Sequence, residues 1–157
     1  MSNDTSSFDL AREFPLSPEK LWTLLTDARQ REAWGAPEEG MELRVEVEDL
    51  REGGLERHRC GPEDAPEFVV HTRWYRIDAP RRAVFSETVS VGGEALGTSL
   101  VTYVLTVRDG GTALGVTVAV SAFGGPEMLG EFKAGWEGGL ANLERLVTRT
   151  LADTDAS

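Results

Sequence analysis

The stretch PEMLGEFKAGWEGGLANLERLVTRTLA, residues 126–152, determines the fold expected for this chain of 157 residues. Before this stretch apolar residues mostly alternate with polar ones, whereas within it they recur at the spacing of an α-helix. The residues on this apolar stripe are Met128, Phe132, Trp136, Leu140, Leu143 and Val147. A helix of this length runs roughly 40 Å, at about 1.5 Å per residue, so it is long enough to cross a whole sheet.

Three glycines interrupt the helical pattern, at Gly135, Gly138 and Gly139. Each costs about 1 kcal/mol of helix stability relative to alanine. Small residues inside a helix permit close approach of another backbone or leave volume beside the helix. The alternative is a helix that is held in place only by packing.

The chain before residue 126 predicts one strand, two short helices and six further strands. Phe8–Phe14 alternates apolar and polar residues, as a strand with one buried face does. Ser17 followed by Pro18 is typical of a helix start, and Thr26 or Asp27 is suited to cap a second helix. The six later strands are expected at Met41–Val47, Leu55–Cys60, Phe68–Ile77, Val84–Val91, Ser99–Val107 and Thr112–Phe123.

These elements predict an α+β fold in which a curved antiparallel sheet wraps around the long C-terminal helix. A sheet with one apolar face needs a cover, and only residues 126–152 form a helix long enough to provide it. Part of the concave face is then left unfilled near the short helices, and concave apolar spaces are the usual sites for small molecules. We expect one domain over residues 8–152, with a disordered N-terminal tail (1–7) and a C-terminal tail (153–157).

The charge of the chain argues against several classes of partner. Lys and Arg number 16 against 27 Asp and Glu, which gives a formal net charge of −11, and both halves of the chain are acidic. Nucleic acids and anionic membranes attract basic patches, so neither is expected as a partner. Much of the acidity belongs to solvent faces of strands, as the alternation of Glu42, Glu46 and Glu48 with apolar residues indicates.

Cysteine and histidine usage argues against disulfide and metal chemistry. Cys60 is the single cysteine, so the chain forms no internal disulfide; the thiol is either passive or reactive. His58 and His71 are the two histidines and lack the paired spacing of zinc ligands, so we expect neither a metal nor a cofactor. The sequence shows no secretory leader and no apolar run of membrane length, which predicts a cytoplasmic protein without membrane insertion.

Five motifs in a fixed order resemble a known family. They are FPLSPEKLWTLLTD (residues 14–27) with Trp34 after it, DLREGG (49–54), IDAPRRAVF (77–85), GTAL (111–114) and Gly135-Trp136. Together they span about residues 8–150 and resemble the family named for the activator of heat-shock-protein-90 ATPase (AHSA-like), within the START-like (SRPBCC) helix-grip superfamily. The chain departs from the family pattern at Ala79-Pro80, where Pro-Pro is frequent, and at Thr72, where Gly is frequent.

The resemblance implies a helix-grip fold with a pocket between the sheet and the C-terminal helix. Members of the superfamily bind lipids, polyketides, hormones or other apolar ligands, and some catalyse cyclisation or hydrolysis. The eukaryotic namesake is a co-chaperone. A shared fold supports a function only by association, so the residues of the site have to carry the argument.

The strand over residues 67–77 carries polar residues on both faces, so its pattern does not decide which face borders the cavity. If Ile77 packs inward, strict alternation also places His71, Arg73 and Tyr75 in the cavity. The alternative is that the sidedness is reversed, or that this end of the strand is exposed.

Neighbouring strands add polar groups to this candidate site. Phe85 would bring Glu87 to the cavity face of its strand, and Tyr103, flanked by apolar residues, is expected to point inward. A buried Arg73 would have to pair with Glu87, because an unpaired buried charge is very costly. The alternative is a surface cross-strand pair. Inside the cavity, these groups could orient the polar head of a ligand or act in acid–base chemistry.

Three further aromatic residues complete the predicted ligand-binding set. Trp34 ends the second short helix, where the mouth of a pocket would lie, while Phe132 and Trp136 lie on the apolar stripe of the last helix. Aromatic side chains dominate the walls of cavities, but each of these could instead pack in the core.

Binding of a small apolar or amphipathic molecule in the cavity is the function we expect, and no catalytic residue is assigned. One alternative is a cyclase-type or hydrolase-type enzyme that uses the same cavity, and another is a co-chaperone-like interaction protein. A homodimer through an exposed strand edge or the loop at Gly92-Gly93 is left open by the sequence.

Overall fold

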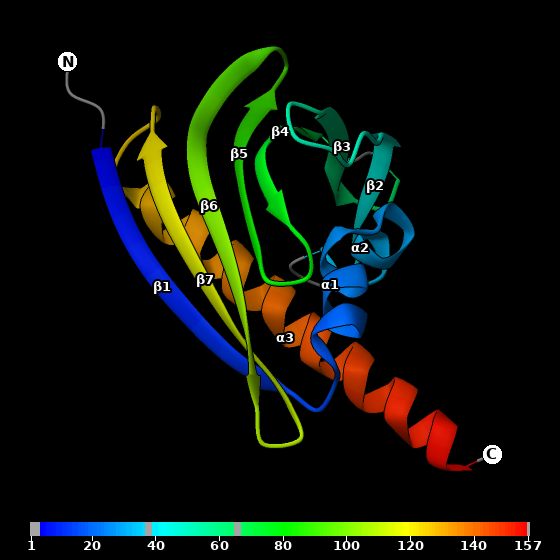
Figure 1. Cartoon of the computed structure of the whole chain (residues 1–157). Coiled ribbons are helices and arrows are strands. Elements are labelled where there is room, and N and C mark those ends of the chain that lie inside the picture. The colour runs from blue at the N-terminus through cyan, green and yellow to red at the C-terminus, as the bar shows by residue number, and fades with distance from the viewer. Residues whose placement is uncertain (1–3, 37–38, 65–66, 157) are drawn as a thin grey trace.

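The computed structural model describes residues 4–36, 39–64 and 67–156 and shows an α+β fold, as predicted (Figure 1). Two short helices follow the first strand, six strands come next, and a long helix ends the chain. The elements are β1 (Asp4–Phe14), α1 (Pro18–Thr26), α2 (Ala28–Trp34), β2 (Met41–Val47), β3 (Leu55–Pro62), β4 (Phe68–Asp78), β5 (Arg82–Val91), β6 (Glu94–Arg108), β7 (Gly111–Ala122) and α3 (Glu127–Ala156).

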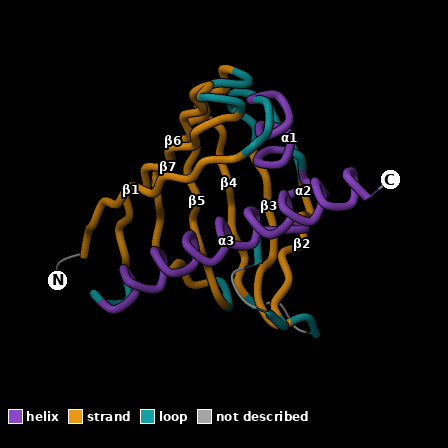
Figure 2. Tube along the Cα trace, turned by 90° about the horizontal axis from the view of Figure 1, so that it is seen from below, coloured by secondary structure: helices purple, strands orange, loops and turns teal. Residues whose placement is uncertain are grey.

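All the strands belong to one antiparallel sheet in the order β1-β7-β6-β5-β4-β3-β2. Every neighbouring pair except β1–β7 is consecutive in the sequence, so the order is a meander closed by the first strand. Helix α3 crosses one face of this sheet diagonally, and its C-terminal end extends past the sheet beside α1 and α2 (Figures 1 and 2). No helix among the described residues is long and apolar enough to cross a membrane.

The two short helices are set by their caps. Ser17 accepts a hydrogen bond from the backbone N–H of Lys20 at 3.3 Å, and Pro18 occupies the first turn of α1. Asp27 ends α1 and also caps α2, because its carboxylate accepts from the N–H of Gln30 at 3.2 Å. The sharp break at Asp27 turns α2 against β2 and α3, where it borders the space between the helix and the sheet.

The stripe on α3 divides into two parts. Leu140, Leu143 and Val147 are fully or almost fully buried and form the core together with residues of α1, while α3 as a whole contacts β1 and β7. Trp136 and the stripe residues before it are only partly buried, because the sheet curves away from this half of the helix and leaves a cavity. The period switch in the sequence therefore predicts the cover of the sheet.

The first strand and the last helix extend into both segments that the sequence predicts as tails, residues 1–7 and 153–157. Strand β1 starts at Asp4, because residues 4–7 pair with residues 119–122 of β7, and α3 continues to Ala156. Backbone pairing with β7 holds residues 4–7 in a strand, although their mostly polar side chains do not predict one. Residues 1–3 and 157 of the expected tails lie outside the described residues.

Strand β4 contains a β-bulge that decides which side chains face the helix. Trp74 pairs with Phe85, but the next pair in the register is Arg76 with Val84, so Tyr75 is an extra residue. The extra residue reverses the alternation along β4. As a result, Ile77 and Trp74 both contact the core although an odd number of positions separates them.

Candidate functional site

A cavity of about 300 Å³ lies between the sheet and the N-terminal half of α3, bordered by α2 and β2. Most of its wall is apolar. The apolar lining residues are Leu25, Trp34, Met41, Leu43, Phe68, Val70, Trp74, Phe85, Val89, Leu96, Met128, Phe132 and Trp136. The volume is at the lower end of the range for small-molecule sites, about 300–1,000 Å³.

Four aromatic rings form a continuous wall from the sheet to the helix. The ring centroids of Trp74 and Phe85 are 4.8 Å apart, those of Phe85 and Tyr103 5.1 Å, and those of Tyr103 and Trp136 6.1 Å. Tilted and edge-on contacts of this kind hold each ring at a fixed angle. The wall is therefore a rigid surface on which a flat apolar molecule can stack.

A row of polar residues crosses the inner face of the sheet, and its two middle members, Thr72 and Glu87, line the cavity. Glu56 of β3 is paired with Thr72 of β4, Thr72 with Glu87 of β5, and Glu87 with Ser99 of β6. Directly opposed residues of antiparallel strands lie on the same face of a sheet. The cavity therefore has a narrow polar band inside a largely apolar lining.

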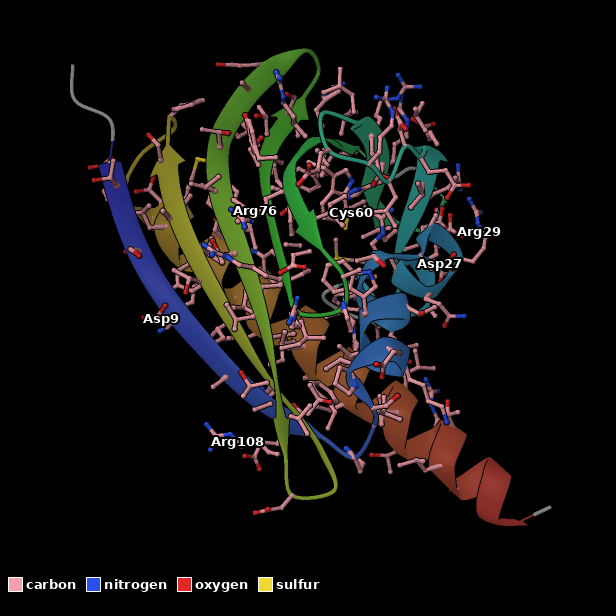
Figure 3. All side chains as sticks on the ribbon, viewed as in Figure 1. Asp9, Asp27, Arg29, Cys60, Arg76 and Arg108 are labelled. Atoms are coloured by element: carbon pink, nitrogen blue, oxygen red, sulfur yellow. The ribbon has the colours of Figure 1, made fainter. Side chains whose placement is uncertain are left out.

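Arg31 reaches this row from α2. Its Nη2 donates to Oε1 of Glu56 at 2.8 Å, and the side chain of Glu56 is only 1% exposed. The other carboxylate oxygen of Glu56 accepts from the backbone N–H of Asp49 at 2.9 Å. The neighbouring Arg29 is mostly exposed and projects from the periphery of α2 (Figure 3). Of the two arginines, Arg31 is therefore the one that brings positive charge to the cavity.

Several polar atoms on the wall lack a partner. Among the described residues, the buried side-chain atoms without any hydrogen bond are Nε of Arg31, Nδ1 of His58, Oγ1 of Thr72 and Nε1 of Trp74. All four belong to residues that line the cavity. Buried polar groups are almost always hydrogen-bonded in folded proteins, so four unpaired atoms in the residues around one space distinguish this part of the molecule.

The surroundings shift the titration of the groups in the cavity. Burial raises the pKa of Glu87 to about 7, an effect that the nearby positive charge of Arg31 partly offsets. Burial also lowers the pKa of His58 to about 4, with a smaller contribution from Arg31, so the imidazole is neutral at neutral pH. Burial, reinforced by Glu87, raises the pKa of Tyr103 and keeps its hydroxyl protonated.

Cys60 also lines the cavity, next to this band. Burial raises the pKa of its thiol, and the Glu87 carboxylate raises it further, although a backbone hydrogen bond with Gly61 acts in the opposite direction. The thiolate is the reactive form of cysteine. The site therefore favours the passive thiol of the two alternatives.

The sequence matches the family model described as Activator of Hsp90 ATPase homolog 1-like protein over residues 15–148. The chain belongs to this family. The resemblance drawn from the five motifs is thereby confirmed. A search of the curated proteins finds no match.

Solved structures show the same fold as this family member. Protein Mll3558 from Rhizobium loti is 28% identical with a TM-score of 0.79, and the alignment covers 92% of this chain and 99% of that one. Protein CV1439 from Chromobacterium violaceum is 21% identical with a TM-score of 0.78, covering 90% and 96%. DynU16, a protein in the dynemicin biosynthetic locus, is 19% identical with a TM-score of 0.66, covering 90% of this chain and 47% of that one.

Six of the nine residues predicted from the sequence for the site do line the cavity of this family member. They are Trp34, Phe85, Glu87, Tyr103, Phe132 and Trp136. Trp34 is fixed at the border of the cavity because its Nε1 donates to the carbonyl of Leu24 at 2.7 Å. Phe85 and Tyr103 are almost fully buried, as their inward orientation requires.

The prediction that His71, Arg73 and Tyr75 face the cavity is wrong. All three lie on the outer face of the sheet, where Arg73 packs over the ring of Tyr75 at 5.3 Å and Tyr75 is 51% exposed. Ile77 does pack toward the core, but the bulge at Tyr75 reverses the alternation before it. The pairing of Arg73 with Glu87 is wrong for the same reason, since the two residues lie on opposite faces.

The residues that replace them come from the other face of β4, from β3 and from α2. Thr72 and Trp74 occupy the inward positions of β4, His58 lies on β3, and Arg31 lies on α2. Glu56 and His58 alternate with Arg57 and Arg59 along the sequence, but both faces of that strand are polar. No sequence signal distinguishes the buried face.

The shape and lining of the cavity suit a molecule with a large apolar surface and a small polar group. Glu87 is chemically suited to accept or donate a proton near neutral pH, because its pKa lies there. Among the residues that the structure describes, no group of three or more His, Cys, Asp or Glu side chains is placed to hold a metal ion.

Proposed function

We propose that this protein binds a small amphipathic molecule in the cavity between its sheet and helix α3. The observation that carries the proposal is the lining itself: the wall of the cavity is largely apolar and holds four aromatic rings, and the polar residues Thr72 and Glu87 border the same space. An open apolar space of this kind forfeits packing contacts that the side chains around it would otherwise make. A bound amphipathic molecule would supply those contacts and bring its polar group to the polar part of the lining.

The glycine on α3 that faces the cavity supports this proposal. A Cβ atom built on Gly135 would have no atom within 4 Å, although the residue lines the cavity. The helix therefore runs past open space at this point, where a larger side chain would be expected if packing alone mattered. The location of DynU16 in a biosynthetic locus also fits a role in binding a small organic molecule.

A binding screen with one blocking variant tests the proposal. Wild-type protein is incubated with a library of aromatic and lipid-like molecules, and complexes are detected by native mass spectrometry. Trp34, Trp74 and Trp136 all line the cavity, so quenching of tryptophan fluorescence gives an independent readout. We expect hits that Gly135→Phe abolishes, because its ring fills the space.

The matched control is Gly130→Phe, on the same helix. This position is exposed, and a Cβ atom built on it would likewise have no atom within 4 Å, so the variant carries the same ring to solvent. It should bind as the wild type does. Binding that is unaffected by Gly135→Phe, or no hit from the whole library, would refute the proposal.

A second candidate function is proton-transfer catalysis in the same cavity. Glu87 supports it, because a carboxyl group with a pKa of about 7 and no side-chain partner among the described residues can act as a general base. The test is turnover of any molecule that the screen identifies. Loss of turnover in Glu87→Gln with retained binding would favour the enzyme, while unchanged ligand after prolonged incubation would favour a binding protein.

A further inference from the structure

The bulge in β4 also shapes the outer face of the sheet, opposite the cavity. Consecutive residues of a regular strand point to opposite faces, but the extra residue Tyr75 and its neighbour Arg76 are both exposed on the outer face. Arg73 is exposed there as well, and its guanidinium carbon lies 5.3 Å from the centre of the Tyr75 ring. The outward side chains of β4 at this point are therefore two arginines beside one aromatic ring.

Neighbouring strands enlarge this cluster. Leu55 of β3 is paired with Arg73 and is 61% exposed, and Val104 of β6 is paired with Arg82 of β5 and is 44% exposed. Arg82 lies two positions from Val84, the partner of Arg76, and so shares its face. We call this surface the outer patch; its members are Leu55, Arg73, Tyr75, Arg76, Arg82 and Val104.

The three arginines of the outer patch lack an acidic partner among the described residues. Eight other arginines form ion pairs with Asp or Glu, whereas no ion pair in this part of the chain involves Arg73, Arg76 or Arg82. Asp78, which the register places opposite Arg82, instead accepts from Arg81 at 3.4 Å. The outer patch therefore presents unpaired positive charge on a chain whose formal net charge is −11.

The composition of the outer patch is typical of a protein-binding surface. Arginine and tyrosine are enriched among the residues that contribute most to binding energy at protein interfaces, and lysine is depleted there. A guanidinium offers paired N–H donors that match the two oxygens of a carboxylate. Bulges commonly turn side chains toward functional positions, and this one adds a charge and an aromatic ring to a face that needs neither for the core.

The charge of the patch and of the whole chain together indicate the partner. Three unpaired arginines are complementary to carboxylates or phosphates. A nucleic acid or an anionic membrane presents phosphates over a much larger area, however, and would bring them within the screening length of about 8 Å of the acidic remainder of the chain. A short acidic segment of a protein can contact the outer patch alone.

We propose that the outer patch binds an acidic segment of a partner protein. Its carboxylates pair with Arg73, Arg76 and Arg82, and an apolar side chain of the segment packs against Tyr75 and Leu55. This inference is independent of the proposed function, because the outer patch shares no residue with the lining of the cavity.

A random peptide library tests the proposal without assuming the sequence of the partner. Peptides displayed on phage are selected on the immobilised protein at physiological salt. We expect the enriched peptides to combine clusters of Asp or Glu with an aromatic or aliphatic residue. The dissociation constants of the synthesised peptides, measured by fluorescence anisotropy, should rise about tenfold or more in the double variant Arg73→Ser with Arg76→Ser, and likewise in Tyr75→Ser.

The matched control is the double variant Arg108→Ser with Arg149→Ser. Both residues are exposed and form no ion pair in the described part of the chain, so this variant loses the same charge elsewhere. Figure 3 labels Arg76 and Arg108 and shows them in separate parts of the sheet. The control should bind the peptides nearly as the wild type does. A second check is charge reversal: peptides with Lys in place of Asp and Glu should bind Arg73→Glu with Arg76→Glu and not the wild type.

Several results would overturn the proposal. These are no enrichment, enrichment of peptides without acidic residues, or an equal loss of affinity in the control, which would mean that total charge attracts the peptides. Vesicles containing phosphatidylserine and a DNA duplex are measured alongside, and tighter binding of either that the double variant Arg73→Ser with Arg76→Ser abolishes would replace the protein partner. A dimer in sedimentation that the same variant dissociates would make a second copy the occupant. None of these results bears on the cavity, which Gly135→Phe tests separately.

Discussion

The guanidinium of Arg31 donates to the carboxylate of Glu56 at 2.8 Å, joining α2, which borders the cavity, to β3. Only 12% of the Arg31 side chain and 1% of the Glu56 side chain are exposed. This contact holds the short helix over the sheet at the border of the cavity. The contact also neutralises Arg31, which is the one Lys or Arg side chain among the described residues that line the cavity.

Replacing Arg31 by methionine should destabilise the protein strongly. The variant leaves the Glu56 carboxylate buried without a positive partner, and breaking one side of a buried pair typically costs about 3–5 kcal/mol. The free energy of unfolding, measured by urea denaturation, checks this. The double variant Arg31→Met with Glu56→Gln should recover much of the loss, because no buried charge is left; a loss as large as that of Arg31→Met alone would contradict the assignment.

Glu87 should make the folded protein less stable as the pH rises. Its pKa is about 7 in the fold against an ordinary 4.5, so the folded state binds more protons than the unfolded state between these values. Stability is therefore lost as pH rises from about 4.5 through about 7. We expect Glu87→Gln to remove this loss and to raise the free energy of unfolding near pH 8 by up to about 3 kcal/mol. A variant with no gain at that pH would show that the carboxylate is not desolvated.

His58 should have the opposite effect at acid pH. Its pKa is about 4 in the fold against an ordinary 6.5, so the unfolded state binds more protons and stability is lost as pH falls through this range. His58→Gln should flatten that part of the stability curve, while His71→Gln on the outer face should leave it unchanged. Since Glu87 and His58 oppose each other between about pH 4.5 and 6.5, the slope in Glu87→Gln should be steeper there than in the wild type.

Two buried threonines should respond oppositely to the same substitution. The Thr72 hydroxyl has no partner, whereas the Thr112 hydroxyl donates to the carbonyl of Leu16 at 2.7 Å. Removing an unsatisfied group gains stability, and removing the partner of a buried carbonyl costs about 1–3 kcal/mol. We expect Thr72→Val to stabilise the unliganded protein and Thr112→Val to destabilise it in thermal unfolding. A loss of stability in Thr72→Val would mean that its hydroxyl is already satisfied.

Replacing either of two glycines between the helix and the sheet by alanine should change stability in opposite directions. Gly135→Ala places a methyl group in open space and removes the glycine penalty, so stability should rise by about 1 kcal/mol. Gly97→Ala places it 2.8 Å from the carbonyl oxygen of Ser121 and 2.9 Å from the ring of Phe132, and should cost about 1–3 kcal/mol. The midpoints of urea unfolding check both, and equal effects would rule out the open space beside Gly135.

The strength of local signals explains how much of the fold could be predicted. The Ser17 cap with Pro18 and the Asp27 cap place the short helices to within a residue, since capping is a contact over three residues. Strands β2, β3, β4, β5 and β7 lie within two residues of the expected bounds, because turns and alternation are local as well. The prediction for β6 is wrong at its start, since the strand begins at Glu94 and not at Ser99. The extension of β1 to Asp4 could not be predicted, because its order comes from pairing with β7 more than a hundred residues away.

The candidate site was predicted only in part. The residues that a regular local pattern places were predicted correctly, and those that depend on an irregularity in a strand were not. Phe85, Tyr103 and the aromatic residues on α3 are placed by regular periodicity, and they line the cavity. His71 and its neighbours were placed by counting along β4 across Tyr75, where the register shifts. An error of one residue in a strand exchanges its two faces, so all three positions failed together.

The sequence by itself determined the long covering helix, the succession of helices and strands along the chain, and the acidic charge that argues against nucleic acids as partners. Each depends on composition or on a period that repeats many times, so one irregularity does not alter it. Only the tertiary structure decided which face of β4 borders the cavity, that Arg31 pairs with Glu56, and that four polar atoms remain unpaired among the described residues. These depend on a single extra residue in a strand and on contacts between elements distant in sequence, for which the chain carries no repeating signal.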